Sequence, residues 1–403
     1  MKRIFIILVS FCAFIGYISA QNIVEIDGIY YILDNNGEAS VYSSQGLNGR
    51  ERGKSDYSGN ITIPENITYN NKSYTVIDIL DGAFSGCPNL TSVSLPNTLK
   101  EIDSYSFVYC PKLTEITIPA SVTFIDIGAF AYMSALIDIN VDPENKKYCS
   151  VDGVLYNITK TILCSYPGGR TTPSKFPNEL TTIRTYAFEG SKIEYIRIPD
   201  TVTKIREDAF FNCVNLYAVI LSPNTSTIEE GTFSNCESLK SIIIPEGVSI
   251  IKEDAFSGSG LKAIDLPESL VSIKGRQFGA PLKTVISRSV TPPSVNFRIG
   301  DHERTLYVPL ESIELYENTD SWGWFKAYLP LEDAPDISID IPDNGDNKEP
   351  DNGDNNSVGT LEDFNDGSKI IYDFSGRKLS NVKDIKELTP GFYIINGKKY
   401  LLK

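Results

Sequence analysis

Histidine is almost absent from this chain of 403 residues: His302 is the only one, and Trp and Met occur twice each. A Ser-His-Asp or Cys-His catalytic pair could therefore be built only around His302, and zinc sites that need several histidines are excluded. The cysteines include no Cys-x-x-Cys pair, and no Gly-x-Gly-x-x-Gly or P-loop string occurs. We therefore predict no enzyme, no metal site and no cofactor.

Positive charge is also scarce, since 37 Lys and Arg face 52 Asp and Glu. Residues 332–366 hold twelve acids against the single base Lys348, whereas residues 367–403 hold eight bases and three acids. The remaining body is acidic throughout. Because phosphate neutralisation needs a basic patch, this distribution argues against a nucleic-acid partner.

Long apolar runs are missing except at the N-terminus. Residues 1–20 combine Lys2 and Arg3, an apolar run from Ile4 to Ile18, and the small residues Ser19 and Ala20. This pattern predicts a signal peptide that is cleaved before Gln21, and no stretch after it is long enough to span a membrane. We expect the mature chain to be secreted or held at the outer cell surface.

What the sequence has in abundance is one repeated unit, approximately I-P-x-x-V-x-x-I-x-x-x-A-F-x-x-C-x-x-L-x-x-I-x-I-P. Its Phe recurs at intervals of 22 or 23 residues, apart from one interval of 58. We call these residues the marker phenylalanines: Phe84, Phe107, Phe130, Phe188, Phe210, Phe233, Phe256 and Phe278. A fixed period of this length predicts a repeat solenoid.

Each unit predicts a short strand, a second extended run and a tight helical turn. Leu-x-x-Ile-x-Ile alternates as a strand with one buried face does, and the Pro that follows has no N–H to donate. Ala-Phe then enters the core on the helical turn. We therefore expect a solenoid that is mainly β with short helical turns, whose marker phenylalanines form a single internal file.

The interval of 58 residues predicts one enlarged unit, with Phe176 and Pro177 in place of Ile-Pro. A hairpin insertion near 141–175 should pair Val154–Tyr156 with Thr161–Leu163. It should protrude from the array or cover one side of it.

The ends depart from the repeat. Residues 21–60 predict an N-terminal cap, and residues 61–331 the repeat solenoid, closed at 300–331 by a C-terminal cap in which Trp322, Trp324 and Phe325 cover the last coil. Residues 332–357 predict an acidic flexible linker and residues 358–403 a small β module. The clusters Asp343–Asp346 and Asp351–Asp354 offer oxygen ligands for calcium, but the twelve-residue loop that ends in Glu is missing, so a disordered linker is favoured.

Four cysteines each lie three residues after a marker phenylalanine: Cys87, Cys110, Cys213 and Cys236. Stacked coils would bring neighbours to about 5 Å, so Cys87–Cys110 or Cys213–Cys236 disulfides are geometrically possible. A ladder of buried free thiols is the favoured alternative, because Met133 and Ser191 occupy the same position in other units.

The repeat, as in IPEGVSIIKEDAFSGSGLKAIDLP, resembles the BspA-like class of leucine-rich repeats, and the SVDGVLYN insertion and TLYVP cap are also typical of that class. The resemblance covers about 61–331 and implies a surface-displayed solenoid without catalytic residues, often associated with adhesion. The tail, IYDFSGRKL followed by LTPGFYIINGKKYLLK, resembles the C-terminal sorting segment of the Bacteroidetes type IX secretion route, and implies a contact with secretion machinery.

The outward positions of the predicted strands indicate a binding surface. In the later coils these positions gather aromatic, basic and aliphatic side chains, which is the composition of a partner patch. The candidate partner-binding residues are Tyr195, Arg197, Tyr217, Ile220, Ile243 and Asp265. The leading hypothesis is adhesion to a protein or glycan on host or neighbouring cells; a carbohydrate-binding or carbohydrate-processing protein and a structural spacer are the alternatives.

Overall fold

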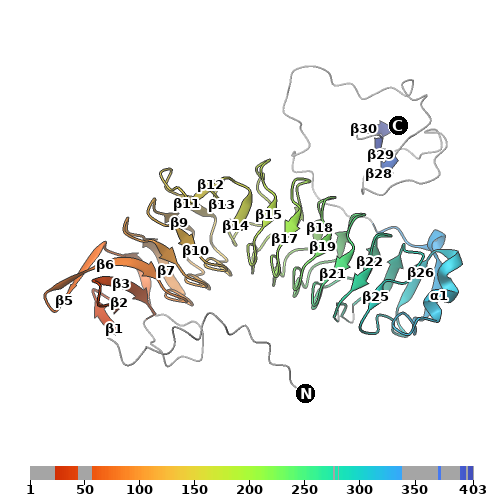
Figure 1. Ribbon diagram of the computed structural model, residues 1–403, viewed down its shortest axis with the longest axis horizontal. Coiled ribbons are helices and arrows are strands. Elements are labelled where there is room, and N and C mark those ends of the chain that lie inside the picture. The colour runs from red at the N-terminus through yellow and green to blue at the C-terminus, as the bar shows by residue number, and fades with distance from the viewer. Residues whose placement is uncertain are drawn as a thin grey trace.

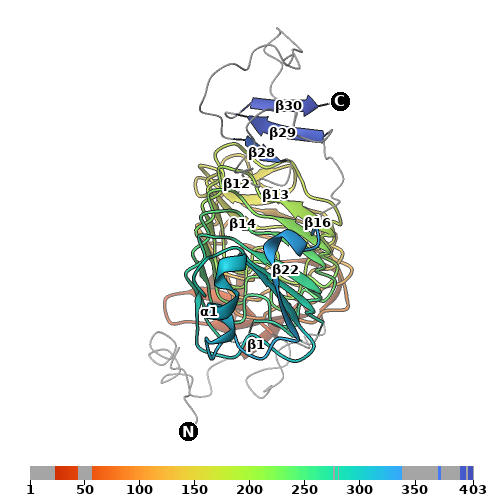
Figure 2. The same cartoon turned by 90° about the vertical axis from the view of Figure 1, so that its right-hand side faces the viewer.

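The computed structural model describes residues 23–43, 57–275, 277–279 and 281–337, together with three strands within 371–402. Figure 1 shows the part from β1 (Ile23–Ile26) to β27 (Ala327–Pro330) as an arched row of stacked coils. Figure 2 looks along this row, so that the coils lie behind one another. The predicted solenoid, mainly β with short turns, is confirmed.

The first strands of the coils form a set that we call row A. The members are β4 (Ser58–Thr62), β7 (Asn89–Ser94), β9 (Glu115–Ile118), β11 (Asp138–Val141), β16 (Tyr195–Arg197), β18 (Ala218–Ile220), β20 (Ser241–Ile243), β22 (Ala263–Leu266), β24 (Thr284–Ser287), β26 (Thr305–Val308) and β27. They pair in parallel in four groups: β4 with β7, β9 with β11, β16 to β20, and β22 to β27. The pairing from β16 to β20 is in register, as in Ile196↔Val219↔Ile242, so that the repeated Ile and Val side chains stack inside, whereas the β4–β7 pairing has a register shift at Gly59 and Asn60.

The second extended run of each coil forms row B, which consists mostly of two-residue strands. Its buried Ile residues come from the V-x-x-I part of the repeat, as in Ile183↔Ile205. The members are β6 (Lys72–Ile79), β8 (Glu101–Ile102), β10 (Phe124–Ile125), β14 (Ile162–Ser165), β15 (Thr182–Ile183), β17 (Lys204–Ile205), β19 (Thr227–Ile228), β21 (Ile250–Ile251), β23 (Ser272–Ile273) and β25 (Ser294–Val295).

The marker phenylalanines stack as the repeat predicted, but in two files and with two additional rings. One file runs from Tyr57 through Phe84 and Phe107 to Phe130, with ring centroids 4.8–5.7 Å apart. The other begins at Tyr166, whose ring lies 4.6 Å from that of Phe188, and continues to Phe278. Tyr166 takes the Phe position of a coil of its own. The prediction of one enlarged unit between Phe130 and Phe188 is therefore wrong, because two coils occupy that interval.

The insertion separates the solenoid interior into two hydrophobic clusters. Its predicted hairpin is present as β13 (Val154–Asn157) and β14, with Tyr156 opposite Leu163, and β12 (Tyr148–Val151) adds a further antiparallel strand. Both faces of β13 are buried. Leu155 packs in the N-terminal cluster, whereas Val154 and Tyr156 pack in the C-terminal one. The insertion thus neither protrudes nor covers one side; it forms a wall between two cores.

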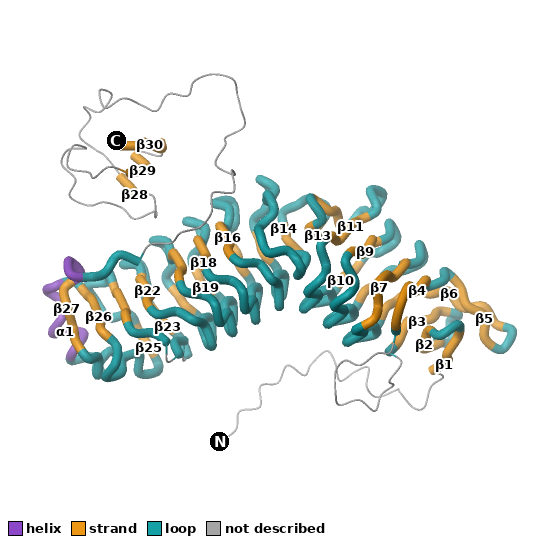
Figure 3. The backbone as a smooth tube through the Cα atoms, turned by 180° about the vertical axis from the view of Figure 1, so that it is seen from behind, coloured by secondary structure: helices purple, strands orange, loops and turns teal. Residues whose placement is uncertain are grey.

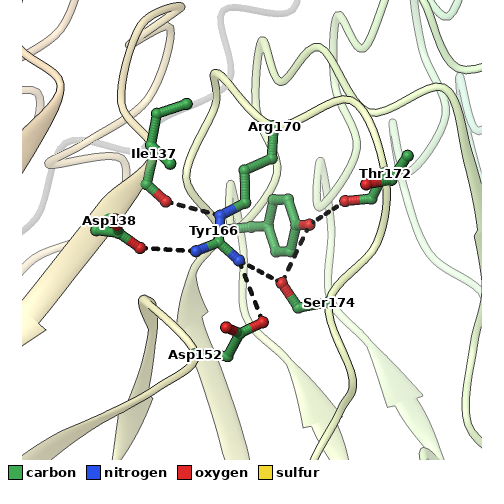
Figure 4. Close-up of polar contacts among 7 residues, drawn as sticks. All are labelled: Ile137, Asp138, Asp152, Tyr166, Arg170, Thr172 and Ser174. Atoms are coloured by element: carbon green, nitrogen blue, oxygen red, sulfur yellow. Dashed lines mark hydrogen bonds and ion pairs between the residues drawn. The ribbon is translucent and has the colours of Figure 1, made fainter.

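Side chains take over hydrogen bonds at this wall, where both strand rows are interrupted. In row B, Arg184 donates to the carbonyl of Ile125 at 2.9 Å, and the Ile125 N–H donates to the Tyr148 hydroxyl. In row A, Arg170 Nε donates to the carbonyl of Ile137 at 2.7 Å (Figure 4). These side chains take the place of strand partners: the Arg184–Ile125 bond is partly buried, whereas the Arg170–Ile137 bond lies at the surface.

The two ends of the array use different devices. At the N-terminus β1, β2 (Ile29–Leu33) and β3 (Glu38–Tyr42) extend row B, and β5 (Asn66–Tyr69) pairs with β6. The C-terminal end carries the short helices η3 (Leu310–Ser312), α1 (Ile313–Glu317) and η4 (Leu331–Asp333); α1 is labelled among the purple helices of Figure 3. Trp322 and Phe325 are buried there as predicted, but Trp324 is exposed, which corrects its assignment to the covering set.

The cysteines of the described residues are all free thiols. Cys110, Cys213 and Cys236 each donate from Sγ to the carbonyl of a marker phenylalanine one coil earlier, at 3.0–3.2 Å. Burial raises the pKa of Cys236 to about 12. The favoured ladder of buried thiols is confirmed, and the two alternative disulfides are absent from these residues.

Several predictions fall on residues that the structure does not describe. The signal peptide 1–20, the two calcium candidates in the linker and most of the tail lie outside the described residues. Of the predicted β module, β28 (Ile371–Asp373), β29 (Gly391–Ile395) and β30 (Lys398–Leu402) form a three-stranded antiparallel sheet.

Candidate binding surface

The outward positions of row A bring three of the predicted residues into one column. Arg197, Ile220 and Ile243 are successive partners in the parallel ladder of β16, β18 and β20. Arg197 is exposed, and the two isoleucines are partly exposed. A guanidinium beside two branched aliphatic side chains on a rigid ribbon can provide both charge and apolar contact to a partner.

Tyr195 does not belong to the exposed surface, which corrects its prediction. Only 5% of this residue is exposed. Its register partner is the small residue Ala218, and the Tyr217 ring lies 6.1 Å away at an angle of 50°. The short alanine side chain leaves room for the Tyr195 ring beside Tyr217, so the ring stays buried instead of presenting a face to solvent.

Asp265 is engaged within the protein. The Arg288 guanidinium donates to both of its carboxylate oxygens, at 2.8 and 2.6 Å. A bidentate pair of this kind holds the carboxylate in place and neutralises it. Asp265 occupies the position of the next coil that is equivalent to Ile243, but its carboxylate is held in an ion pair with Arg288.

Row A changes character along the array. On β7 and β9 the outward residues are exposed and polar, as in Ser94 and Thr117. From β16 onward the column contains larger side chains: Arg197 is exposed, Ile220 and Ile243 are partly exposed, and Ile286 on β24 is buried. This gradient places the candidate surface, defined as Arg197, Ile220 and Ile243, at the start of the C-terminal half.

Among the described residues we looked for catalytic and metal-binding groups. His302 is exposed, with its ring edge-on to Trp324 at 5.5 Å. No group of three His, Cys, Asp or Glu within these residues could hold a metal ion. A hollow of about 310 Å³ lies between β17 and β19, where row B is interrupted; it is lined by Thr203, Lys204, Ile205, Arg206, Asn224, Ser226, Thr227 and Glu229. In the described part of the chain no helix is long and apolar enough to cross a bilayer.

Sequence reasoning missed an exposed aromatic residue in the C-terminal cap. Trp324 is 53% exposed, and the Arg298 guanidinium lies 4.5 Å from its ring centroid. Its backbone is left-handed, with φ of 77°. The neighbouring Trp322, with Nε1–H donating to the carbonyl of Pro293, takes the buried position that sequence alone could not distinguish.

Comparison with protein families identifies the repeat. Six copies of the region described as BspA type leucine rich repeat match residues 60–152 and 167–282. These ranges are more than half of the chain, and the break between them coincides with part of the insertion. The chain belongs to the BspA-type leucine-rich repeat family.

Solved structures with similar coils share little sequence with this chain. A leucine rich cell surface protein from Faecalibacterium prausnitzii is 20% identical, with 80% of this chain and 99% of that chain covered and a TM-score of 0.42. A leucine-rich repeat protein from Bacteroides ovatus is 24% identical, covering 77% and 76%, with a TM-score of 0.45. The pneumococcal vaccine antigen PcpA is 17% identical, covering 76% and 98%, with a TM-score of 0.42. Among curated proteins none matches this chain.

Proposed function

We propose that this protein is displayed outside the cell, where it binds proteins of host or neighbouring cells through the candidate surface of row A. The observation that supports this most is the ladder that aligns exposed Arg197 with Ile220 and Ile243. A solenoid of parallel strands keeps such residues at fixed spacing, which favours many weak contacts over a long surface.

The test is a triple variant with Arg197→Ala, Ile220→Thr and Ile243→Thr. Thr already occupies this column at Thr117, so the ladder should be retained. Binding of the purified chain to immobilised host matrix proteins and to whole cells should fall to background. A matched control, Ser94→Ala with Thr117→Ala, changes the same column in the N-terminal half and should bind as before. Unchanged binding by the triple variant would favour a spacer role, and binding only to glycans would favour the carbohydrate alternative.

Export is proposed to depend on both ends of the chain. Residues 1–20 have the pattern of a signal peptide, and residues 358–403 resemble a type IX sorting segment. Deleting 358–403 should leave the solenoid folded but retain it in the periplasm. Surface labelling of the truncated chain at the level of the full chain would contradict this assignment.

A further inference from the structure

Each of the seven turns from Phe84 to Phe256 contains two left-handed residues, one located two positions before the marker phenylalanine and one two positions after it. In most turns these positions hold residues that tolerate a positive φ: Gly82, Gly86, Gly128, Gly190, Asp208, Asn212, Gly231, Asn235, Asp254 and Gly258. Four of them instead hold tyrosine with φ between 53° and 59°: Tyr105, Tyr109, Tyr132 and Tyr186. We call these four residues the tyrosine patch.

The tyrosine patch carries a conformational cost that its neighbours avoid. A bulky side chain in the left-handed region is strained, and such strain persists where the surrounding structure or the function requires it. All four tyrosines belong to the turns of Phe107, Phe130 and Phe188, next to the wall between the two cores. The strain is therefore concentrated at one place along the array.

The four rings of the patch form two pairs. Tyr109 stacks on Tyr132 with centroids 4.7 Å apart, and Tyr105 lies 6.0 Å from Tyr186. A Cβ atom on Gly190 would come within 2.3 Å of the Tyr132 ring, so this ring covers that glycine closely. Tyr109 is 56% exposed and presents its ring to solvent.

A carboxylate lies buried beside these rings. Glu189, directly before Gly190, is 7% exposed, and its Oε2 atom has no hydrogen-bond partner. The backbone N–H of Tyr132 donates to the Glu189 carbonyl, which places the two side chains at the same site. Burial raises the pKa of Glu189 to about 7; the Asp208 charge adds to this effect, and the Tyr132 hydroxyl opposes it. The charge of Glu189 also reaches Tyr109, Tyr132, Tyr186 and Cys213.

We propose that the tyrosine patch and Glu189 together bind a cationic side chain, arginine or lysine, of a partner protein. Aromatic faces attract cations, and a buried carboxylate with one unpartnered oxygen gains from a positive charge nearby. This inference deepens the proposed function, on which it rests, by naming a second contact surface and the chemistry of its partner. The acidic character of the body favours the same kind of partner.

The test compares two short peptides that differ only in having arginine or its neutral isostere citrulline, titrated against the full chain at low salt. The arginine peptide should bind about tenfold more tightly. Tyr109→Asn and Glu189→Gln should each remove this preference. Asn occupies the same left-handed position at Asn212 and Asn235, so the first variant should keep the turn. The matched controls are Tyr69→Ala and Glu237→Gln, which change an exposed tyrosine and an exposed acid elsewhere.

The pH dependence gives an independent readout. Because the Glu189 pKa is raised to about 7, ionisation and binding should both increase from about pH 6 to pH 8, and Glu189→Gln should abolish the increase. Equal binding of the two peptides, or an unaltered preference in Glu189→Gln, would overturn the proposal. So would competition by a neutral oligosaccharide that is insensitive to Glu189→Gln, because the patch would then be a sugar platform. If the row A triple variant loses adhesion while Tyr109→Asn and Glu189→Gln retain adhesion, only the inference about the tyrosine patch fails. If the row A triple variant retains adhesion while Tyr109→Asn loses its preference for the arginine peptide, the proposed role of row A fails instead.

Discussion

Removing the Arg170 side chain should uncouple the two halves of the solenoid. Its guanidinium donates to the Ile137 carbonyl and to Asp138 Oδ1, both at 2.7 Å, and also to Ser174 (Figure 4). These contacts replace a strand at the interruption of row A. In an array whose stability is a sum of coil and interface terms, the weakest interface decides where cooperativity fails.

The expected loss of unfolding free energy follows from the groups that Arg170→Ala leaves without a hydrogen-bond partner. The arginine side chain is only 16% exposed, whereas that of Asp138 is 42% exposed and can regain water. The Ile137 carbonyl loses the donor that stands in for a neighbouring strand. Because the bond to Ile137 is exposed and Asp138 can regain water, a loss of about 1–2 kcal/mol of unfolding free energy is expected at this interface.

The assay uses the position of the two tryptophans. Trp322 and Trp324 lie in the C-terminal half, so tryptophan fluorescence follows that half alone, whereas far-ultraviolet circular dichroism follows both. In urea the two signals should coincide for the unmodified chain and separate for Arg170→Ala. Arg288→Ala removes another arginine–aspartate pair, with Asp265, where row A is continuous, and should shift the midpoint without separating the signals.

Coincident transitions in Arg170→Ala, or a loss below about 1 kcal/mol, would refute this reasoning. The first outcome would mean that β13 and the remaining hydrogen bonds across the wall suffice for cooperativity. The second would mean that water replaces the guanidinium at Ile137.

Three further predictions concern the core, the charges and the thiols. Phe210→Ala, in the middle of a ring file, should cost about 3–5 kcal/mol of unfolding free energy, and Phe278→Ala, at the partly exposed end of that file, clearly less; equal losses in urea titrations would contradict the stacked-file account. Burial and neighbouring acids raise the pKa of Asp103 to about 6, so the folded protein favours its protonated form and loses stability as pH rises from about 4 to 6. Asp103→Asn should therefore stabilise the protein at pH 7 by about 1–2 kcal/mol and flatten this part of the pH–stability curve. No gain in stability at pH 7 would count against this explanation. Because all six cysteines after residue 20 are free, a reductant should leave the thermal midpoint unchanged, and thiol titration of the denatured mature chain should find six groups; fewer groups would indicate a disulfide.

The periodic part of the fold was predictable from the sequence, because each unit repeats the same physical problem. A strand with alternating Ile, a Pro that ends it and an Ala-Phe turn can bury their apolar side only by stacking. The register of row A follows from that repetition, which is why Arg197, Ile220 and Ile243 were aligned correctly. The ladder of thiols follows for the same reason.

What the sequence did not reveal lies where the repeat is broken. The Tyr166 ring stacks in the file of marker phenylalanines. Because no Ala precedes Tyr166 and Pro167 follows it, the repeat motif did not identify this residue. The burial of Tyr195 depends on Ala218 one coil away, and the engagement of Asp265 depends on Arg288 beyond the next strand. Such contacts join residues about one period apart, and a pattern that describes each unit separately does not include them.

The wall at β13 and the tyrosine patch have a common physical origin. At Tyr166 the turn is shortened, so Tyr132 in the coil before it bonds directly to Glu189 in the coil after it. This direct contact brings the Tyr132 ring over Gly190 and sets the buried Glu189 carboxylate beside the Tyr132 hydroxyl. A regular repeat would present the same small residues at every turn and would offer no distinctive site. The irregular coil interrupts the core, and the same interruption creates a local chemistry that the remaining coils lack; variants that weaken the wall should therefore also weaken peptide binding at the tyrosine patch.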